Sequence, residues 1–273
     1  MRTISSRKSD RVKELVRLHK KSERHTAGLF LAEGPAVVRV ALEYSPENVR
    51  EVFATDEYLE EFLELGAQVT QCTTEVIEAL SGSITPQGVI ALCRTPVVEV
   101  ADICEKPGTL VIVDGISDPG NLGTIIRTAD AIAAAGCLIF GNCVDPFNDK
   151  VVRSSAGSIF RVPVARLAAL ADLPPGRRIF TLSADANLSV NDVEFDSTPV
   201  TWVVGSETHG VSADWSSADW SSADWSSADL VSGGLPVTPV RIPMAQGVES
   251  LNAAVAAAVC MYLSYLRGSD SGK

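Results

Sequence analysis

The distribution of hydrophobic and polar positions divides the chain into two stretches in which strands and helices alternate. Apolar runs of about four to eight residues indicate strands, and apolar residues spaced three and four apart indicate helices. A helix is predicted over 9–21, because its apolar positions fall near one face and Ser9 is a suitable N-cap. The other elements predicted in the first stretch are a strand over 28–31, a helix over 35–43, strands over 49–55, 67–73 and 88–94, and helices over 58–66 and 74–82.

The second stretch opens with the continuous apolar run 109–116, which is typical of a central strand in a parallel sheet. Its other predicted elements are a helix over 120–135, strands over 137–142, 178–184, 201–207 and 240–244, and a closing helix over 249–266. This alternation predicts an α/β protein with a small α/β domain over 1–96, a linker over 97–108, and a second domain with a mostly parallel, covered sheet over 109–273.

The composition is that of a globular protein, with 46% hydrophobic residues. The six cysteines form no CxxC pair and no cluster with zinc spacing, so free thiols and no metal site are expected. The basic N-terminus lacks the apolar stretch of a signal peptide, and the longest apolar segment, 251–266, is shorter than the roughly 20 residues that span a bilayer. A soluble protein of the reducing cytoplasm, without a membrane partner, is therefore expected.

The charges are distributed unevenly. A net charge of −11 argues against a generally basic nucleic-acid-binding surface. Residues 1–40 nevertheless hold ten Lys and Arg against four acids, a local charge of +6. Two interpretations remain open from charge alone: a basic arm that contacts a polyanion, and a solvated helix face without a partner.

The segment 212–229 repeats the sequence Ser-Ala-Asp-Trp-Ser every five residues and holds three of the four tryptophans. This period matches neither a strand nor a helix, and it is far shorter than the repeat of a solenoid. An expanded surface loop without direct chemistry is favoured over an aromatic platform for bases, because an aspartate in every repeat would repel phosphates.

Three segments follow predicted strands, at the edge of an open α/β sheet where ligands bind. In 118–131 a Pro-Gly turn precedes a helix, and Arg127 lies about one turn into it, where a guanidinium can grip a phosphate with two hydrogen bonds. In 203–210 glycines flank Glu207 and allow a ligand to pack against bare backbone. In 241–256 an apolar wall precedes a polar helix start, which suits a ligand with one apolar and one polar end. Taken singly, each segment is also compatible with an ordinary turn, a surface arginine or a capped helix.

A fourth segment, 145–164, supplies Lys150 and Arg153 ahead of a run of small residues. Such cations anchor RNA phosphates, and the alternative is a pair of loop charges at a domain face. Together with the basic arm, this segment gives the candidate RNA contacts, which are Lys8, Arg11, Lys20, Arg24, Lys150 and Arg153.

Taken together, the first three segments resemble the motifs of the SpoU-like (TrmH) branch of the SPOUT RNA methyltransferases. They read NLGTIIRTADA, VGSETHG and IPMAQGVESLNAAVA, in the order and spacing of that family. This resemblance covers about 109–267 and is highly specific. The first domain, through its basic helix and the sequence FLAEG at 30–34, looks more loosely like the substrate-binding domain of the same branch. The five-residue repeat departs from the family pattern, in which the second motif usually leads more directly to the third.

The resemblance implies a fold, a cofactor and an assembly. The first domain would be L30e-like, and the second would contain a deep trefoil knot. The protein would act as a homodimer with its sites at the subunit interface. S-adenosylmethionine would bind in the knot, mostly through backbone atoms, with donor contacts at Gly205, Ile242, Met244 and Leu251.

The resemblance also implies an active site and an activity. The polar residues that match the family's active-site set are Asn121, Arg127, Glu207, Ser250 and Asn252. Arg127 would have the central role, either accepting the hydroxyl proton with help from an RNA phosphate or holding that phosphate and stabilising the developing alkoxide. The implied reaction is methylation of a ribose 2′-hydroxyl in structured RNA, most similar to that of family members acting on rRNA.

The sequence leaves three alternatives to this function. The first alternative is a tRNA 2′-O-methyltransferase, and the second is a non-catalytic RNA-binding protein on the same scaffold. A nicotinamide- or nucleotide-dependent Rossmann enzyme is disfavoured, because no GxGxxG follows the first strand and no Walker A motif is present.

Overall fold

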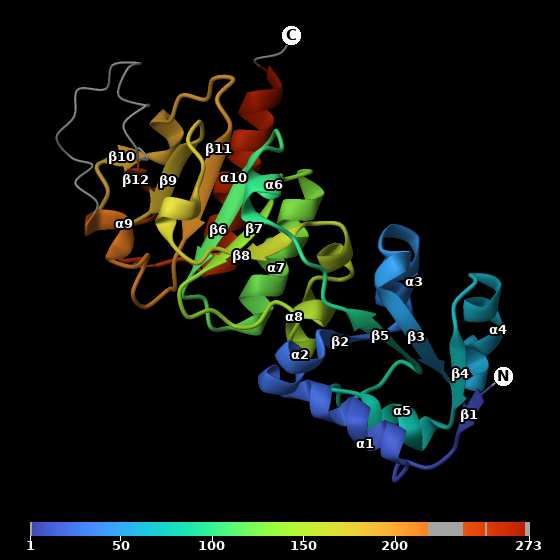
Figure 1. The fold of residues 1–273 in the computed structure, drawn as a ribbon. Helices are drawn as coiled ribbons and strands as arrows, with labels where there is room; N and C mark the ends of the chain where they lie inside the picture. The colour runs from blue at the N-terminus through green and yellow to red at the C-terminus, as the bar shows by residue number, and fades with distance from the viewer. Residues whose placement is uncertain (1, 218–236, 249, 271–273) are drawn as a thin grey trace. The chain divides into compact units, whose positions relative to one another are not determined.

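The chain forms two compact units in the computed structural model, which describes residues 2–217, 237–248 and 250–270 (Figure 1). One unit consists of Met1–Val97 with Asp145–Arg161, and the other of Val98–Val144 with Val162–Lys273. The structural assignment of two segments therefore differs from the one that we predicted from the sequence. Residues 145–161 belong to the first unit, and the expected linker 97–108 carries the helix α6 (Val100–Cys104) of the second unit.

The first unit is built on a five-stranded mixed sheet in the order β1-β4-β3-β5-β2. β4 is parallel to β1 and β3, whereas β5 is antiparallel to β3 and β2. Its strands are β1 (Arg2–Ile4), β2 (Leu29–Glu33), β3 (Val49–Ala54), β4 (Val69–Cys72) and β5 (Val89–Arg94). Its α-helices are α1 (Asp10–Val16), α2 (Lys21–Ala27), α3 (Pro35–Tyr44), α4 (Asp56–Glu64), α5 (Thr74–Leu80) and α8 (Asp149–Ser154).

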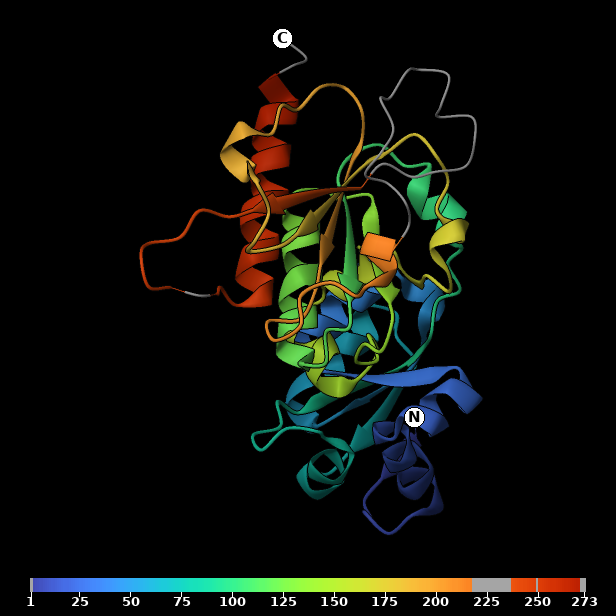
Figure 2. The same cartoon turned by 90° about the vertical axis from the view of Figure 1, so that its left-hand side faces the viewer.

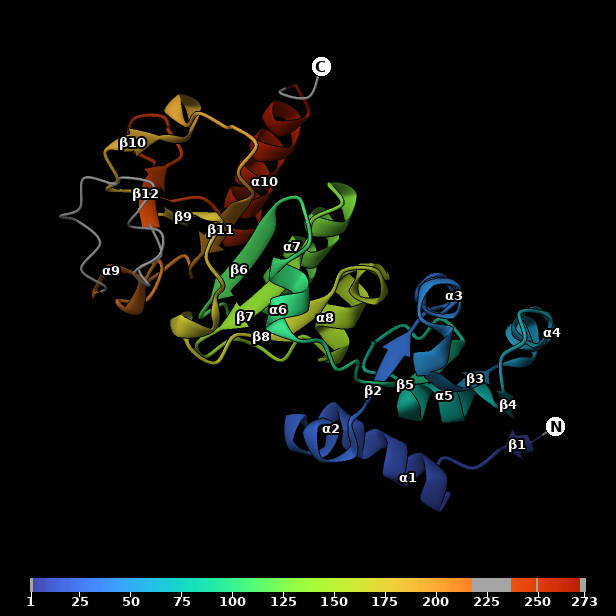
Figure 3. The same ribbon diagram turned by 45° about the horizontal axis from the view of Figure 1, so that its top comes forward.

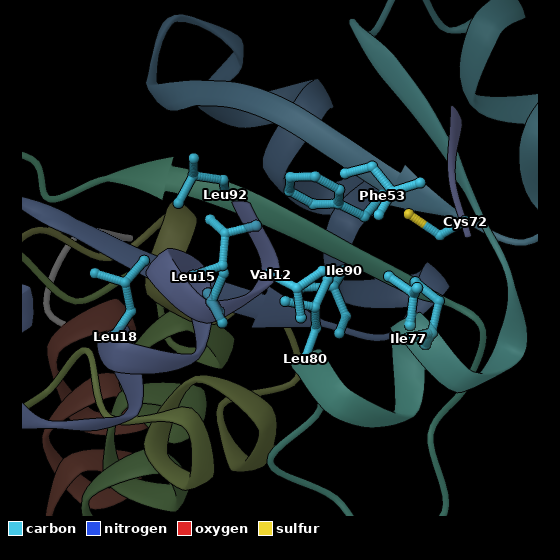
Figure 4. Packing of buried hydrophobic residues seen from close by; sticks show 12 residues of the cluster. Val12, Leu15, Leu18, Phe53, Cys72, Ile77, Leu80, Ile90 and Leu92 are labelled. Atoms are coloured by element: carbon cyan, nitrogen blue, oxygen red, sulfur yellow. The ribbon is translucent and has the colours of Figure 1, made fainter. Parts of the chain in front are cut away.

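Helices α1 and α5 cover one face of this sheet, and α3 and α4 cover the other (Figure 1). On α1, Val12 and Leu15 are three residues apart and therefore share the face that packs with Ile77 of α5 against Phe53 of β3 (Figure 4). Ser9 caps α1 as expected, its Oγ accepting a hydrogen bond from the backbone N–H of Val12 at 3.3 Å.

The helix expected over 9–21 is divided into α1, a 3-10 turn at Arg17–His19, and α2. The division coincides with a buried arginine. Arg24 Nη1 donates to the carbonyl oxygens of Leu18 and His19, at 2.8 and 2.9 Å, so the turn's carbonyl groups bind a side chain instead of continuing a helix. Tertiary contact thus overrides a periodicity that favoured one continuous helix.

The segment 145–161 completes the core of the first unit. Asp145 accepts hydrogen bonds from Nε and Nη2 of Arg24 at 2.8 and 2.6 Å. Phe30 is 1% exposed. The centroid of its ring lies 4.8 Å from that of the Phe147 ring and 6.0 Å from that of the Phe160 ring. These contacts explain why a segment far along the chain belongs to the first unit.

The second unit contains a seven-stranded sheet in the order β10-β12-β9-β11-β6-β7-β8, and every pairing among the described strands is parallel. This confirms the expected α/β fold with a parallel sheet. The strands are β6 (Leu110–Asp114), β7 (Gly136–Phe140), β8 (Val164–Arg166), β9 (Arg178–Leu182), β10 (Leu188–Ser189), β11 (Val200–Val204) and β12 (Val237–Arg241). The remaining α-helices are α7 (Pro119–Ala131), α9 (Asp214–Ser217) and α10 (Ala253–Asp270).

Helices α7 and α10 pack side by side on one face of this sheet, with α6 on the other (Figures 2 and 3). The closing helix α10 begins at Ala253 instead of 249, because Asn252 caps it, and Glu249 lies outside the described residues. No helix in the described ranges is long and apolar enough to cross a membrane. All six cysteines are buried and free, in agreement with the expected reduced thiols.

The structure describes only residues 212–217 of the five-residue repeat. Trp215 is 3% exposed and meets the Phe140 ring edge-on at 5.7 Å between centroids. The first repeat is therefore anchored in the core of the second unit, which differs from the surface loop that we expected for the whole repeat. The later repeats lie outside the described residues.

Candidate active site

A pocket of about 410 Å³ lies in the second unit, at the carboxyl ends of three neighbouring parallel strands. The last residues of β9 and β11, Leu182 and Val204, line it together with Val240 of β12. This is the sheet edge at which open α/β proteins bind their ligands, because connecting loops diverge there.

All four residues expected to contact a methyl donor line this pocket. Gly205 follows β11, and Ile242, Met244 and Leu251 lie between β12 and α10. Glu207 and Ser250 of the expected polar set line it as well. The pocket therefore combines bare backbone, apolar side chains and a carboxylate, which fits a cofactor with a flat apolar base and a positively charged sulfur.

The loop after β11 folds back tightly on Gly205. Ser206 and Gly210 exchange backbone hydrogen bonds of 3.1 and 2.9 Å. A Cβ atom at position 205 would lie 2.0 Å from the carbonyl carbon and oxygen of Gly210. Only glycine fits there, and the pocket wall is consequently made of main chain.

Three polar residues from distant parts of the chain meet beside the pocket. Asn121, in the first turn of α7, donates from Nδ2 to Glu207 Oε1 at 2.7 Å. Asn252 donates from Nδ2 to Asn121 Oδ1 at 2.9 Å and to the same Glu207 oxygen at 3.2 Å. One residue from each of the three motifs thus enters a single hydrogen-bonded cluster.

Helix termini position this cluster. Asp118 caps α7 by accepting from the backbone N–H of Asn121 at 2.8 Å. At α10, Asn252 Oδ1 accepts from the N–H groups of Ala254 and Val255, and Glu207 Oε1 accepts from that of Ala253 at 3.1 Å. The first N–H groups of a helix need such partners and favour negative charge, so the helix start holds the Glu207 carboxylate in place.

The structure does not bring Arg127 into this cluster. Arg127 is exposed on α7 and forms no hydrogen bond or ion pair with any described residue. It is six residues from Asn121, so it points to a different face of the helix. Ser250 lines the pocket but likewise stays outside the hydrogen-bonded cluster.

Sequence reasoning missed two ionisable residues that line the pocket. Asp185 follows β9, and His209 lies in the loop after β11. The signal was available for Asp185, because the strand predicted over 178–184 ends at the same sheet edge as the motifs. Asp185 belongs to no recognisable motif, so the sequence alone does not single it out.

The candidate RNA contacts of the first unit differ in their exposure. Lys8, Lys20 and Lys150 are exposed. Arg24, by contrast, is 3% exposed and holds Asp145, so our expectation that it contacts phosphate is wrong for this structure. A local run of cations in the sequence could not reveal a partner 121 residues away.

Arg11 and Arg153 are also engaged in ion pairs. Arg11 lies 2.8 Å from the buried Glu51 and 3.0 Å from Glu14. Arg153 lies 3.2 Å from Glu33, with about a third of its side chain exposed. Within the described part of the chain, no group of three or more His, Cys, Asp and Glu side chains is arranged to hold a metal ion.

Comparisons with known proteins agree with this geometry. The model of the SpoU rRNA Methylase family matches residues 108–219, and that of the MRM3-like substrate binding domain matches residues 9–91. The chain is 33% identical to the 23S rRNA (guanosine(2553)-2′-O)-methyltransferase RlmP of Bacillus subtilis, over 98% of this chain and 100% of that protein.

Solved structures show the same likeness. An AdoMet-bound rRNA methyltransferase from Sinorhizobium meliloti is 26% identical with a TM-score of 0.81, over 96% of this chain and 97% of that one. The SpoU methyltransferase AviRb from Streptomyces viridochromogenes, in complex with AdoMet, is also 26% identical with a TM-score of 0.80, over 97% and 100%. The chain belongs to the SpoU family of rRNA methylases.

Proposed function

We propose that this protein methylates a ribose 2′-hydroxyl of ribosomal RNA with S-adenosylmethionine as the donor. The observation that carries the proposal is the convergence of two chain-distant motifs on one pocket and of all three motifs on the polar cluster beside it. The names of the relatives support rRNA as the substrate and AdoMet as the ligand.

The residues around the pocket have distinct roles in this proposal. When bound, S-adenosylmethionine supplies an activated methyl group on a positively charged sulfur. Gly205, Ile242, Met244 and Leu251 hold the donor through main chain and apolar contact. The cluster around Glu207 fixes the relative positions of α7, α10 and the loop after β11, and such positioning supplies much of the rate in group transfer.

Arg127 binds the phosphate next to the target ribose and stabilises negative charge as the 2′-oxygen loses its proton. Its exposure and the absence of a described partner leave the guanidinium available to RNA. Arg127→Ala should abolish methyl transfer to rRNA while calorimetry still shows wild-type donor affinity. Near-normal turnover of this variant would overturn the assignment, and Arg127→Lys serves as the charge-retaining control.

The RNA target can be mapped directly. Sites of 2′-O-methylation should be compared in rRNA and tRNA from strains with and without the gene, and after complementation with Arg127→Ala. One rRNA ribose should lose its methyl group and regain it only with the active gene. Loss confined to tRNA, or no change in either RNA, would contradict the proposal.

We propose that the first unit is the substrate-binding domain and that its exposed Lys8, Lys20 and Lys150 contact rRNA phosphates. The match of residues 9–91 to a substrate-binding domain supports this role. Charge reversal at the three lysines should weaken RNA binding and reduce its salt dependence. Donor affinity, measured as a control, should not change.

We further propose that the protein is a homodimer that joins through α10. Four apolar side chains along this helix are exposed at spacings of four and three residues, namely Val255, Val259, Tyr262 and Leu266. Light scattering should give twice the chain mass for the wild type and the single mass for Val259→Glu with Tyr262→Glu. A monomeric wild type would contradict this assembly.

We also propose the deep trefoil knot for the second unit and an L30e-like arrangement for the first. The TM-scores near 0.8 over almost the whole chain support the knot. The mixed sheet between two helical layers supports the L30e-like arrangement. A cytoplasmic location follows from the proposed rRNA substrate.

A further inference from the structure

The pocket carries negative charge that the proposed reaction does not require. Its described lining includes the carboxylates of Asp185 and Glu207 but no lysine or arginine. A ligand in this pocket is therefore exposed to two like charges that no lysine or arginine of the described lining balances. Such a field favours a cationic ligand over a neutral one of the same shape.

The carboxylate of Glu207 already accepts hydrogen bonds within the polar cluster. Its Oε1 accepts hydrogen bonds from Asn121 Nδ2, Asn252 Nδ2 and the Ala253 N–H group. All three donors are neutral groups, and the N–H groups at the start of α10 offset only part of the negative charge of the carboxylate. Glu207 thus contributes charge to the pocket, but its replacement would disturb the whole cluster.

Asp185 is placed differently. It is exposed between β9 and β10 and forms no hydrogen bond or ion pair with any described residue. The turn that carries it is fixed at both ends, because Ala186 N–H donates to Ser183 O at 3.4 Å and Arg241 Nη1 donates to Ala186 O at 3.1 Å. Arg241 therefore holds the backbone beside Asp185, and the Asp185 carboxylate stays available to a ligand.

The proposed reaction changes the charge of the pocket's ligand. The bond between the methyl carbon and the donor sulfur breaks, and a bond to the ribose 2′-oxygen forms. The sulfur keeps the electron pair of the broken bond, and the hydroxyl proton leaves to solvent. The sulfur is thus positive before transfer and neutral afterwards, while the rest of the donor is unchanged.

We propose that Asp185 is a specificity-determining residue, whose charge makes the pocket bind the sulfonium donor more tightly than the thioether product. This inference rests on the proposed function and adds a cause for product release. Asp185 retains the donor before transfer, and its attraction weakens once the methyl group has left. Because the effect is electrostatic, added salt reduces it.

Calorimetry on the full chain tests the proposal with three ligands: S-adenosylmethionine, S-adenosylhomocysteine and sinefungin, an unreactive analogue with an amine cation in place of the sulfonium. Asp185→Asn keeps the size of the side chain and removes its charge. It should weaken binding of the two cationic ligands about three- to tenfold, as expected for partly screened charges several ångströms apart, and that of S-adenosylhomocysteine less than about twofold. Asp185→Glu should restore the discrimination.

Asp192→Asn is the matched control, because Asp192 is an exposed aspartate of the same unit outside the pocket lining. If the affinities for all three ligands fell by the same factor, Asp185 would interact with a group that donor and product share, and the proposal would be overturned. Unchanged affinities would overturn it as well. A wild-type protein that binds none of the ligands would instead contradict the proposed function itself.

Discussion

Asn252 has two separable functions, because its amide group has two ends. Its Oδ1 caps α10, and its Nδ2 joins Asn121 to Glu207. A serine can cap a helix but has no amide to bridge the two partners. The residue therefore links the stability of a helix to the geometry of the site, and substitution can test the two roles independently.

Asn252→Ser should leave the thermal unfolding temperature nearly unchanged and strongly reduce methyl transfer. Asn252→Ala removes the cap as well and should lower the free energy of unfolding by about 1 kcal/mol. Thermal unfolding and methyl transfer should be measured on both variants. Equal stability of the two would contradict the capping role, and wild-type activity of the serine variant would contradict the bridging role.

His19 makes the first unit sensitive to pH. Its Nδ1 contacts the carboxylate of Asp149, and this hydrogen bond raises the pKa of the imidazole above its ordinary value of 6.5, against the opposing effects of burial and of Arg24. A raised pKa means that the folded state binds the proton more tightly. The stabilisation is thus complete below about pH 6.5 and disappears as the pH rises through the raised value.

His19→Asn should therefore lower the free energy of unfolding more at pH 6 than at pH 9. Urea unfolding of the wild type and the variant at both pH values measures the difference. His25→Asn, at an exposed position of α2, is the control. A His19 effect that is the same at both pH values would show that the charged pair does not stabilise the fold.

At the scale of elements, one buried arginine holds α6 and the chain after it. Arg177 donates from Nη1 to the carbonyl oxygens of Cys104 and Lys106, and from Nη2 to those of Gly108 and Val200. Burial lowers the pKa of this guanidinium below its ordinary value, but an arginine stays protonated at neutral pH. Carbonyl groups at the end of a helix are a favourable environment for such a cation.

Arg177→Met should destabilise the second unit by about 3 kcal/mol, because several buried carbonyl groups lose their donors at once. Arg166→Lys is a suitable comparison, since Arg166 is exposed and donates to one carbonyl group. Urea unfolding measures both changes. A loss no larger than that of the comparison variant would show that the segment is held by its apolar contacts alone.

The elements that could be predicted from the sequence are those with a regular pattern. The strands β6 and β11 are continuous apolar runs, and both lie where they were expected. The two-residue β10 and the three-residue β8 were missed, because so few residues show no period. The five-residue helix α6 falls within the predicted linker for the same reason.

Only part of the site could be predicted from the sequence, because Arg127 and Ser250 lie outside the hydrogen-bonded cluster. Glycine and amide motifs are local in sequence, so the cluster of Asn121, Glu207 and Asn252 could be expected from them. Asp185 carries no motif, and its place depends on where β9 ends in three dimensions. Arg24 was misassigned because its exposure depends on Asp145, whose position only the folded chain determines.

At the scale of the whole molecule, the first unit is not encoded by one continuous stretch. A fragment of residues 1–97 would leave Arg24 without Asp145 and expose the Phe30 ring to water. An unpaired buried charge and an exposed aromatic side chain each cost several kcal/mol. These costs are comparable to the total stability of a small domain.

The fragment 1–97 should therefore be largely unfolded, whereas residues 1–97 joined to 145–161 by a flexible Gly-Ser linker should fold. Circular dichroism and the dispersion of amide NMR signals distinguish the two outcomes. A shorter fragment that folds as well as the joined one would contradict the structural role assigned to the segment 145–161.

The chain passes between the two units three times, after residues 97, 144 and 161. A chimera that takes its first unit from a relative must therefore exchange the chain at all three junctions. A single crossover near residue 97 would combine residues 1–97 of one protein with the segment 145–161 of the other. The side chains of that segment, which contains α8, would then face neighbours that they do not fit. Recombination at that point alone would thus produce hybrids whose first unit has a mismatched core.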